Sequence, residues 1–147
     1  MKKQWIIRLF ILFSVLAAAV PAFSAPWAKA DIVNGQITIP VDKVMDGKAH
    51  FYEYKFGKNT IYYFVLKSSD NVIRAAFNAC DVCYQSKKGY RQDGDYMICN
   101  NCGSRFTSVS INIVKGGCNP SPLDRTISGN NVVINVSDME KGIAYFR

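Results

Sequence analysis

Histidine is nearly absent from this sequence, with His50 as its single instance among 147 residues. Most acid–base catalytic triads depend on histidine, and no glycine-rich phosphate-binding loop follows a predicted strand. Asp93 and Asp95 flank Gly94 and are typical of turn residues, not of a catalytic pair of carboxylates. Hydrolytic and group-transfer enzymes therefore have little support. Whether the protein is an enzyme stays open, with a non-enzyme favoured.

Glycine and proline are also few, at 10 and 5 residues, while 49% of the residues are hydrophobic and 20% are charged. Such a composition excludes collagenous, low-complexity and disordered chains. A length of 147 residues fits one folded domain and excludes a collection of several.

Acidic residues are missing from the first thirty positions, where Lys2, Lys3, Arg8 and Lys29 lie. The formal net charge of the whole chain is +7, and these four side chains account for more than half of it. Residues 31–147 carry only +3, from 14 basic and 11 acidic side chains. No basic stripe remains that would indicate a nucleic-acid partner.

The same N-terminal segment has the features of an export signal. Its basic start precedes residues 9–20, which are apolar except for Ser14, and small-residue cleavage sites follow at residues 22–24 and 28–30. This run is short for a membrane-spanning helix, which needs about 20 apolar residues. We expect residues 1–30 to be a signal peptide or an N-terminal anchor. Residues 31–147 are then a single domain that is exported, periplasmic or on the outer face of the cytoplasmic membrane, with peripheral or anchored membrane association open.

Helical periodicity and internal repeats are missing from residues 31–147, where short β-branched and aromatic runs alternate with turn residues. Gly57-Lys58-Asn59 and Asp93-Gly94 predict two tight hairpins. Residues 137–140 predict at most one helical turn. The pattern indicates a mainly β fold, a small antiparallel barrel or sandwich with two cysteine-bearing loops. The expected strands are residues 36–41, 50–56, 60–67, 72–79, both arms of 90–99, 109–114 and 132–136.

Cysteine forms the most specific pattern in the sequence. Cys80, Cys83, Cys99 and Cys102 have the spacing C-x2-C-x15-C-x2-C. Two residues between cysteines allow a tight turn to direct both sulfurs at one ion or cluster, and a hairpin brings the second turn beside the first. The spacing predicts a four-thiolate metal site. Cys118, which follows two glycines, is a further candidate ligand.

Two other uses of these cysteines stay open. Cysteines outside the cytoplasm usually form disulfides, and two bridges with one free thiol would need no metal. Thiol–disulfide exchange is the other alternative, although neither cysteine pair opens a predicted helix, where such redox motifs lie.

The identity of a bound metal is limited by the shortage of histidine. A site rich in sulfur favours an iron–sulfur cluster, zinc or Cu(I) over magnesium, calcium or manganese. A Rieske centre needs two histidine ligands and is excluded by the single His50. His50 lies on an aromatic strand far from the cysteines in sequence, so we expect it to be an ordinary strand residue.

At these residues the sequence resembles the FtrD-like family of membrane-associated iron–sulfur-containing proteins, formerly a domain of unknown function. The match spans roughly residues 35 to 146. The segments that carry it are residues 75–83, which contain Cys80 and Cys83, 88–90, 97–103, which contain Cys99 and Cys102, and 116–123, which contain Cys118.

The resemblance implies an iron–sulfur cofactor held by Cys80, Cys83, Cys99 and Cys102, with Cys118 as a further candidate. It also implies partners, namely an iron-uptake permease or a periplasmic metal-binding or redox protein. We therefore expect an exported metal-binding protein that serves electron transfer or iron handling. The alternatives are a disulfide- or zinc-stapled binding module without redox chemistry, and a thiol–disulfide oxidoreductase; zinc or copper are the alternative metals.

Overall fold

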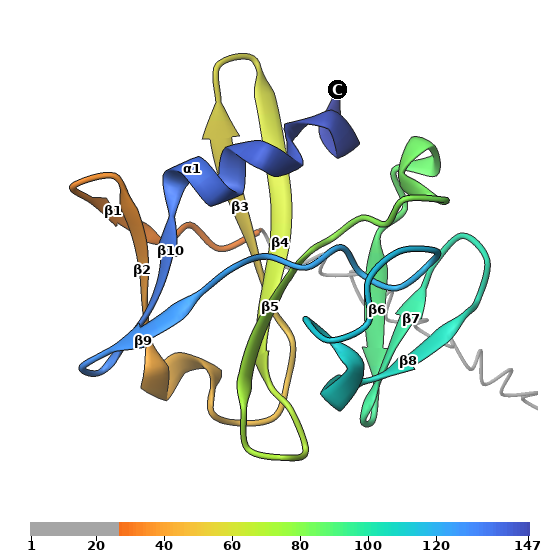
Figure 1. Ribbon diagram of the computed structural model, residues 1–147, viewed down its shortest axis with the longest axis horizontal. Helices are drawn as coiled ribbons and strands as arrows, with labels where there is room; N and C mark the ends of the chain where they lie inside the picture. The colour runs from red at the N-terminus through yellow and green to blue at the C-terminus, as the bar shows by residue number, and fades with distance from the viewer. Residues whose placement is uncertain (1–26) are drawn as a thin grey trace, which may run out of the picture.

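The computed structural model describes residues 27–147, and the expected signal or anchor segment lies almost entirely outside them. The described chain is mainly β, as predicted, and its strands form three small antiparallel sheets (Figure 1). Sheet A contains β3 (His50–Phe56), β4 (Asn59–Lys67) and β5 (Ile73–Phe77). Sheet B has the order β1 (Asp31–Val33), β2 (Gln36–Pro40), β10 (Asn131–Asn135) and β9 (Thr126–Ser128). Sheet C contains β6 (Tyr90–Asp93), β7 (Tyr96–Cys99) and β8 (Arg105–Thr107).

Sheet A lies between the other two sheets (Figure 1), and both of its faces are packed. Because side chains alternate along a strand, β4 sends Tyr63 and Val65 to one face and Phe64 and Leu66 to the other. We call the cluster toward sheet B the first core and the cluster toward sheet C the second core. The first core also contains Ile37, Ile39, Tyr52, Ile61, Phe77, Leu123, Val132, Ile134 and Met139. The second core also contains Ala76, Tyr90, Met97, Ile111 and two cysteines, Cys80 and Cys99.

The two predicted hairpins are confirmed. His50 pairs with Val65 and Phe56 with Asn59 across the β3–β4 turn, and Tyr90 pairs with Cys99 across the β6–β7 turn. Gly57 and Gly94, at the two turns, both have a positive φ of 57°. A side chain would be strained there, so glycine allows the tight reversal.

The strand expected at residues 109–114 is wrong. This segment forms the 3₁₀ turn η3 (Ser108–Ser110) followed by a further turn. Asn112 has φ 66°, a left-handed conformation that interrupts a strand. Its side chain accepts a hydrogen bond from the backbone N–H of Ala75 at 2.8 Å and donates to the carbonyl of Leu123 at 3.2 Å. Residues 109–114, which we call the wedge, are therefore held between sheet A and the chain that follows.

The helical C-terminal segment is longer than the single turn predicted from residues 137–140. Helix α1 (Val136–Glu140) continues as the 3₁₀ segment η4 (Lys141–Phe146), which crosses sheet A in Figure 1. Met139, Ile143, Tyr145 and Phe146 pack against the first core, and this burial stabilises a helix too short to form alone. Within residues 27–147, no helix is long and apolar enough to cross a membrane.

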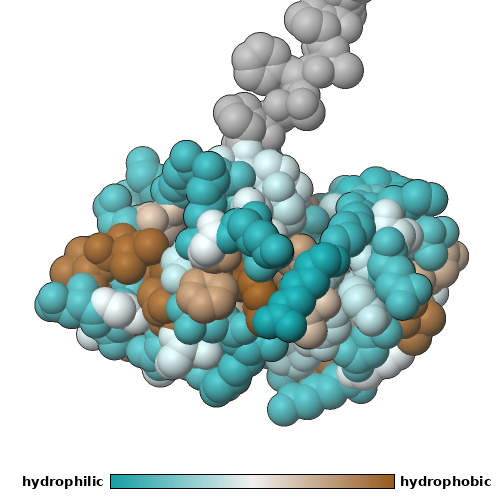
Figure 2. Space-filling model, turned by 90° about the horizontal axis from the view of Figure 1, so that it is seen from above, coloured by the Kyte–Doolittle hydropathy of each residue, from teal (hydrophilic) through white to brown (hydrophobic). Residues whose placement is uncertain are grey.

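The short strands β1, β8 and β9 were not expected from the sequence. Each has only three residues, and most of their side chains are exposed. Ile32, Val33 and Ile127 leave apolar surface at the sheet B end, where Figure 2 shows a patch of hydrophobic side chains at the left. Strands β1 and β9 have no buried side chain, and β8 is too short to show the alternation that marks a strand in a sequence.

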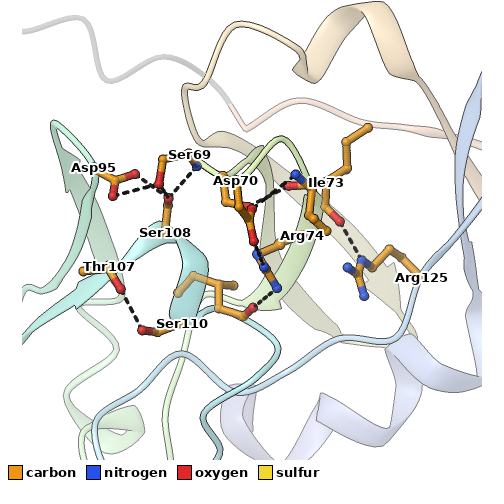
Figure 3. Close-up of polar contacts among 12 residues, drawn as sticks. Ser69, Asp70, Ile73, Arg74, Asp95, Thr107, Ser108, Ser110 and Arg125 are labelled. Carbon is orange, nitrogen blue, oxygen red and sulfur yellow. Dashed lines mark hydrogen bonds and ion pairs between the residues drawn. The ribbon is translucent and has the colours of Figure 1, made fainter.

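A buried arginine connects sheet A to the wedge that follows sheet C (Figure 3). Arg74 is 5% exposed and donates to Ser68 Oγ at 2.8 Å, to the Ile111 carbonyl at 3.0 Å and to Asp70 Oδ2 at 2.5 Å. Ser108 extends the network by accepting a hydrogen bond from the Ser69 backbone at 3.0 Å. A buried charge is tolerated when it is paired and hydrogen-bonded in this way. The network fixes the start of the loop that carries Cys118.

Candidate metal centre

Both C-x2-C turns lie at the same end of sheet C. Cys80 and Cys83 follow β5 directly, and the chain then enters η2 (Tyr84–Ser86) and β6. Cys99 is the last residue of β7, and Cys102 lies in the turn that leads to β8. The β6–β7 hairpin brings the second turn beside the first, as the spacing of the two pairs predicts. This end is at the upper right of Figure 1.

The five sulfur atoms form two groups that share one member. Those of Cys80, Cys83 and Cys99 lie within 4.8 Å of one another, and so do those of Cys83, Cys102 and Cys118. The Sγ atoms of Cys83 and Cys118 lie 3.6 Å apart. The structure thus gathers the four cysteines of the C-x2-C pairs and adds Cys118 to them. Cys83 is the centre of the arrangement.

All five cysteines are free thiols in the structure. A separation of 3.6 Å is much longer than the about 2.05 Å of a disulfide bond. It is close to the roughly 3.8 Å between sulfurs that share a tetrahedral ion at about 2.3 Å from each. The arrangement therefore has the dimensions of a thiolate site for a metal.

His50 takes no part in either sulfur group. It lies on β3 with its Nε2 atom 2.7 Å from Asp46 Oδ1, as a half-exposed strand residue. Asp81 lies next to Cys80 in sequence, but its carboxylate accepts a hydrogen bond from the Tyr145 hydroxyl at 2.6 Å. The two groups found among the described residues contain sulfur alone. A donor set of this kind suits an iron–sulfur cluster, zinc or Cu(I).

The centre has a buried side and an exposed side. Cys80 and Cys99 are 1% and 2% exposed and belong to the second core. Cys83 and Cys118 are half-buried, and Cys102 is exposed. A metal held here would be anchored from the core and open to solvent or a partner on the side of Cys102.

Hydrogen bonds to sulfur distinguish the cysteines from one another. The Cys83 backbone N–H donates to Cys80 Sγ at 3.2 Å, and Asn101 Nδ2 donates to Cys83 Sγ at 3.4 Å. The neutral Cys102 thiol donates to Ser104 Oγ at 3.2 Å, and the ionised thiolate accepts a hydrogen bond from the same hydroxyl. Side-chain and backbone hydrogen bonds from Ser104 lower the pKa of Cys102 to about 6, because they favour the thiolate.

Burial has the opposite effect on Cys99. It raises the pKa of this thiol to about 11, because a charged sulfur is disfavoured in the second core. The pKa of Cys118 is raised by hydrogen bonding with Cys102 and by desolvation. Before a metal binds, the exposed Cys102 therefore ionises more readily than Cys99 or Cys118.

Two polar residues and a glycine that the sequence did not mark as functional support the cysteine loops. The Tyr90 hydroxyl donates to the Cys118 carbonyl at 2.5 Å, and its ring packs on Phe64 in the second core. Asn78 Oδ1 accepts a hydrogen bond from the Tyr90 backbone N–H at 2.8 Å. Gly89 makes room for Asn78, since a Cβ atom there would lie 2.2 Å from Asn78 Nδ2. These contacts join the first cysteine loop, the start of β6 and the Cys118 loop.

Comparison with known proteins identifies one matching family. A family model described as membrane iron-sulfur containing protein FtrD-like matches residues 44–146, a range that contains all five cysteines. Among solved structures, the chain is similar to that of the quaternary ammonium Rieske monooxygenase CntA in complex with an inhibitor, with 16% identity and a TM-score of 0.46. That match covers 71% of this chain and 32% of the other, so the chain spans about a third of its length. No curated protein matches the chain.

Proposed function

The chain belongs to the FtrD-like family of membrane iron-sulfur containing proteins, and from that premise we propose that it is an exported electron-transfer protein with an iron–sulfur centre. The observation that carries the proposal is the gathering of five cysteine sulfurs, with Cys83 common to both groups. Catalytic acid–base chemistry has no comparable support, because the single histidine lies apart from the sulfurs.

In this proposal Cys80, Cys83, Cys99 and Cys102 hold the centre, and Cys118 is a fifth ligand candidate. A cluster of the four-thiolate kind supplies one-electron redox chemistry when bound. Cys80 and Cys99 anchor it from the second core, while the exposed Cys102 gives one edge of the centre contact with solvent. Access at one edge supports electron exchange with a partner.

The physiological role proposed for this centre is electron transfer in iron uptake or handling. The partner would be an iron-uptake permease or a periplasmic metal-binding or redox protein. Support comes from the family match and from the sulfur-only donor set.

Export is part of the proposal, and it has its own test. N-terminal sequencing of protein recovered from outside the cytoplasm should find a chain that begins after one of the small-residue sites at 22–24 or 28–30. A chain that begins at Met1 would instead support an N-terminal anchor. Recovery from the cytoplasm alone would contradict export.

A second candidate function is a binding module in which zinc has a purely structural role. The observation in its favour is that Cys80 and Cys99 are packed among the apolar side chains of the second core. Zinc bound there would stabilise sheet C without redox chemistry.

One experiment separates these functions. Protein exported by its own N-terminus is purified without oxygen, and its iron, zinc, copper and acid-labile sulfide are measured per chain, followed by its visible spectrum with and without dithionite. Two or four atoms of iron with matching sulfide, and a spectrum that bleaches on reduction, are expected. About one zinc per chain and no redox response would support the structural role. Disulfides in non-reducing mass spectrometry, without metal, would contradict both.

Single Cys→Ser variants assign the ligands. Cys80→Ser, Cys83→Ser and Cys99→Ser should each lose most of the metal, because serine is a poor ligand for a soft metal. Ser104→Ala is the matched control, since it changes a neighbour of Cys102 and leaves every sulfur in place. The assignment is overturned if Cys80→Ser, Cys83→Ser and Cys99→Ser keep the metal content of the unaltered chain.

A further inference from the structure

A pocket opens directly beside the cysteine centre. Its volume is 290 Å³, and Cys80, Cys83 and Cys99 form part of its wall. The pocket lies among the start of β4, the segment from Asn78 to Tyr90 and the C-terminal η4. A molecule bound there would be in contact with the sulfur groups.

Aromatic rings dominate the wall of the pocket. Between ring centroids, Tyr62 lies 6.0 Å from Phe146 and Tyr84 lies 5.7 Å from Tyr145. Tyr90 completes the set. Aromatic side chains stack on flat, unsaturated rings, so this wall favours a flat, unsaturated ligand over a flexible aliphatic one.

The charged side chains that border the pocket are cationic. Lys87 and Lys88 border it, and no Asp or Glu is among the described residues that do. Lys87 Nζ donates to the Arg147 carbonyl, which leaves Lys88 as the cation available to a ligand. The hydroxyls of Tyr90 and Tyr145 are engaged by Cys118 and Asp81. In the part of the chain that the structure describes, the hydroxyls of Tyr62 and Tyr84 thus remain for a ligand.

Volume limits the ligand further. A cavity of about 150 Å³ is enough for benzene. A pocket of 290 Å³ therefore admits one substituted or fused ring and is too small for an entire flavin nucleotide. The ligand class that fits is a flat ring with carbonyl oxygens that accept hydrogen bonds from lysine and tyrosine.

We propose that this pocket binds the ring of a quinone, placed against the cysteine centre by Lys88, Tyr62 and Tyr84. The inference rests on the proposed function and names the small molecule that exchanges electrons with the centre. Oxidation of a bound hydroquinone to the quinone releases two electrons and two protons. A cluster held by the cysteines would take up these electrons one at a time and pass them to two one-electron acceptors such as Fe³⁺, each of which is reduced to Fe²⁺, while the protons go to solvent.

Duroquinone, a fully methylated benzoquinone, is the probe, because its ring carbons have no free position for addition of a thiol. It is titrated without oxygen into the purified full chain with its metal, and heat release is measured. Saturable binding at one site per chain is expected. Durene has the same ring and methyl groups without the carbonyls, and it should bind at least about tenfold more weakly, as expected for lost hydrogen bonds to a charged donor.

Variants locate the binding site. Lys88→Gln and Tyr84→Leu should each weaken duroquinone binding by about tenfold. Lys43→Gln removes a lysine from the 3₁₀ turn η1 (Val41–Val44), outside the pocket, and should leave binding unchanged. The inference is overturned if duroquinone does not saturate, if durene binds equally well, or if Lys43→Gln weakens binding as much as Lys88→Gln.

The same samples keep this test apart from the proposed function. Metal content and dithionite bleaching report on the centre without any quinone. A reducible iron centre without duroquinone binding would contradict the quinone site alone. Duroquinone binding to a protein with zinc and no redox response would support the site but contradict electron transfer.

Discussion

The two cores on opposite faces of sheet A differ in what completes them. The first core is closed by aliphatic and aromatic side chains from sheet B, α1 and η4. The second core has a similar apolar floor from β4 and β7, but Cys80 and Cys99 occupy part of its wall. The first core is thus complete from side chains alone, whereas the second is completed by thiols that are ligands in the proposed centre. From this difference we expect the folding of sheet C to be coupled to the binding of a metal by these thiols.

Removal of the metal is the change with the largest expected effect. Chelation should expose β7 and its neighbours in sheet C while sheet B stays folded, because a structural metal site contributes on the order of 10 kcal/mol to folding. Hydrogen exchange measures this: amides of Tyr96–Cys99 should lose protection, and amides of Asn131–Asn135 should keep it. Equal loss of protection in both sheets would contradict the separation of the two cores.

Two matched substitutions, each of which creates a cavity in one of the cores, test whether the second core alone is linked to metal binding. Ile134 in the first core and Met97 in the second are both fully buried, and replacement of either by alanine should cost about 2–5 kcal/mol of unfolding free energy. Met97→Ala should also lower metal affinity, because Met97 packs in the same cluster as Cys80 and Cys99. Urea unfolding and competition with a chelator measure the two quantities. An equal loss of metal affinity in Ile134→Ala would contradict a specific link between the second core and metal binding.

The buried Arg74 connects the two halves, so its replacement tests how the Cys118 loop is held. Arg74→Met keeps much of the side-chain volume but removes the bonds to Ser68, Asp70 and the Ile111 carbonyl. The expected cost is about 1–3 kcal/mol, since the Ile111 carbonyl is left without this donor. Lys67→Met, in a half-buried strand position, is the control and should cost less. Thermal unfolding of both variants gives the comparison, and equal costs would remove the network's assigned role.

Alkaline pH should destabilise the fold through a buried tyrosine of the first core. Burial raises the pKa of Tyr63, and the nearby Tyr52, whose ring stacks on it at 5.4 Å between centroids, adds to the rise. The unfolded chain loses this proton near pH 10, while the fold resists the charge. Stability from this group is therefore constant below about pH 10 and falls above it, by up to about 1.4 kcal/mol per pH unit.

The check on this prediction is urea unfolding between pH 8 and pH 11. Tyr63→Phe should flatten the decline, because phenylalanine has no proton to lose. A variant with the same slope as the original chain would show that other groups control alkaline unfolding.

Much of the fold and of the candidate site could be predicted from the sequence, in the places where local chemistry decides the structure. Both hairpins have turn residues that favour a tight reversal, and the C-x2-C spacing predicted which loops meet. The strand expected at 109–114 is wrong because the side chain of Asn112 bonds to two distant backbone groups, which no local pattern shows.

The pocket beside the centre was likewise beyond reach of the sequence. Trp27, Tyr62 and Tyr145 come from three distant segments, and tertiary packing alone brings them together. The length of the C-terminal helical segment has the same cause, since its stability comes from burial against the first core.

X-ray absorption, measured at the absorption edge of the metal that copurifies with the protein, directly tests whether both C-x2-C turns bind one centre. We predict a first coordination shell of sulfur alone, at about 2.3 Å, and an additional iron shell if the centre is an iron–sulfur cluster. In Cys83→Ser, which should lose most of the metal, the shell around the metal that remains should have fewer sulfur atoms, because Cys83 belongs to both sulfur groups. A shell of nitrogen or oxygen atoms, or one that is unchanged in Cys83→Ser, would contradict this prediction.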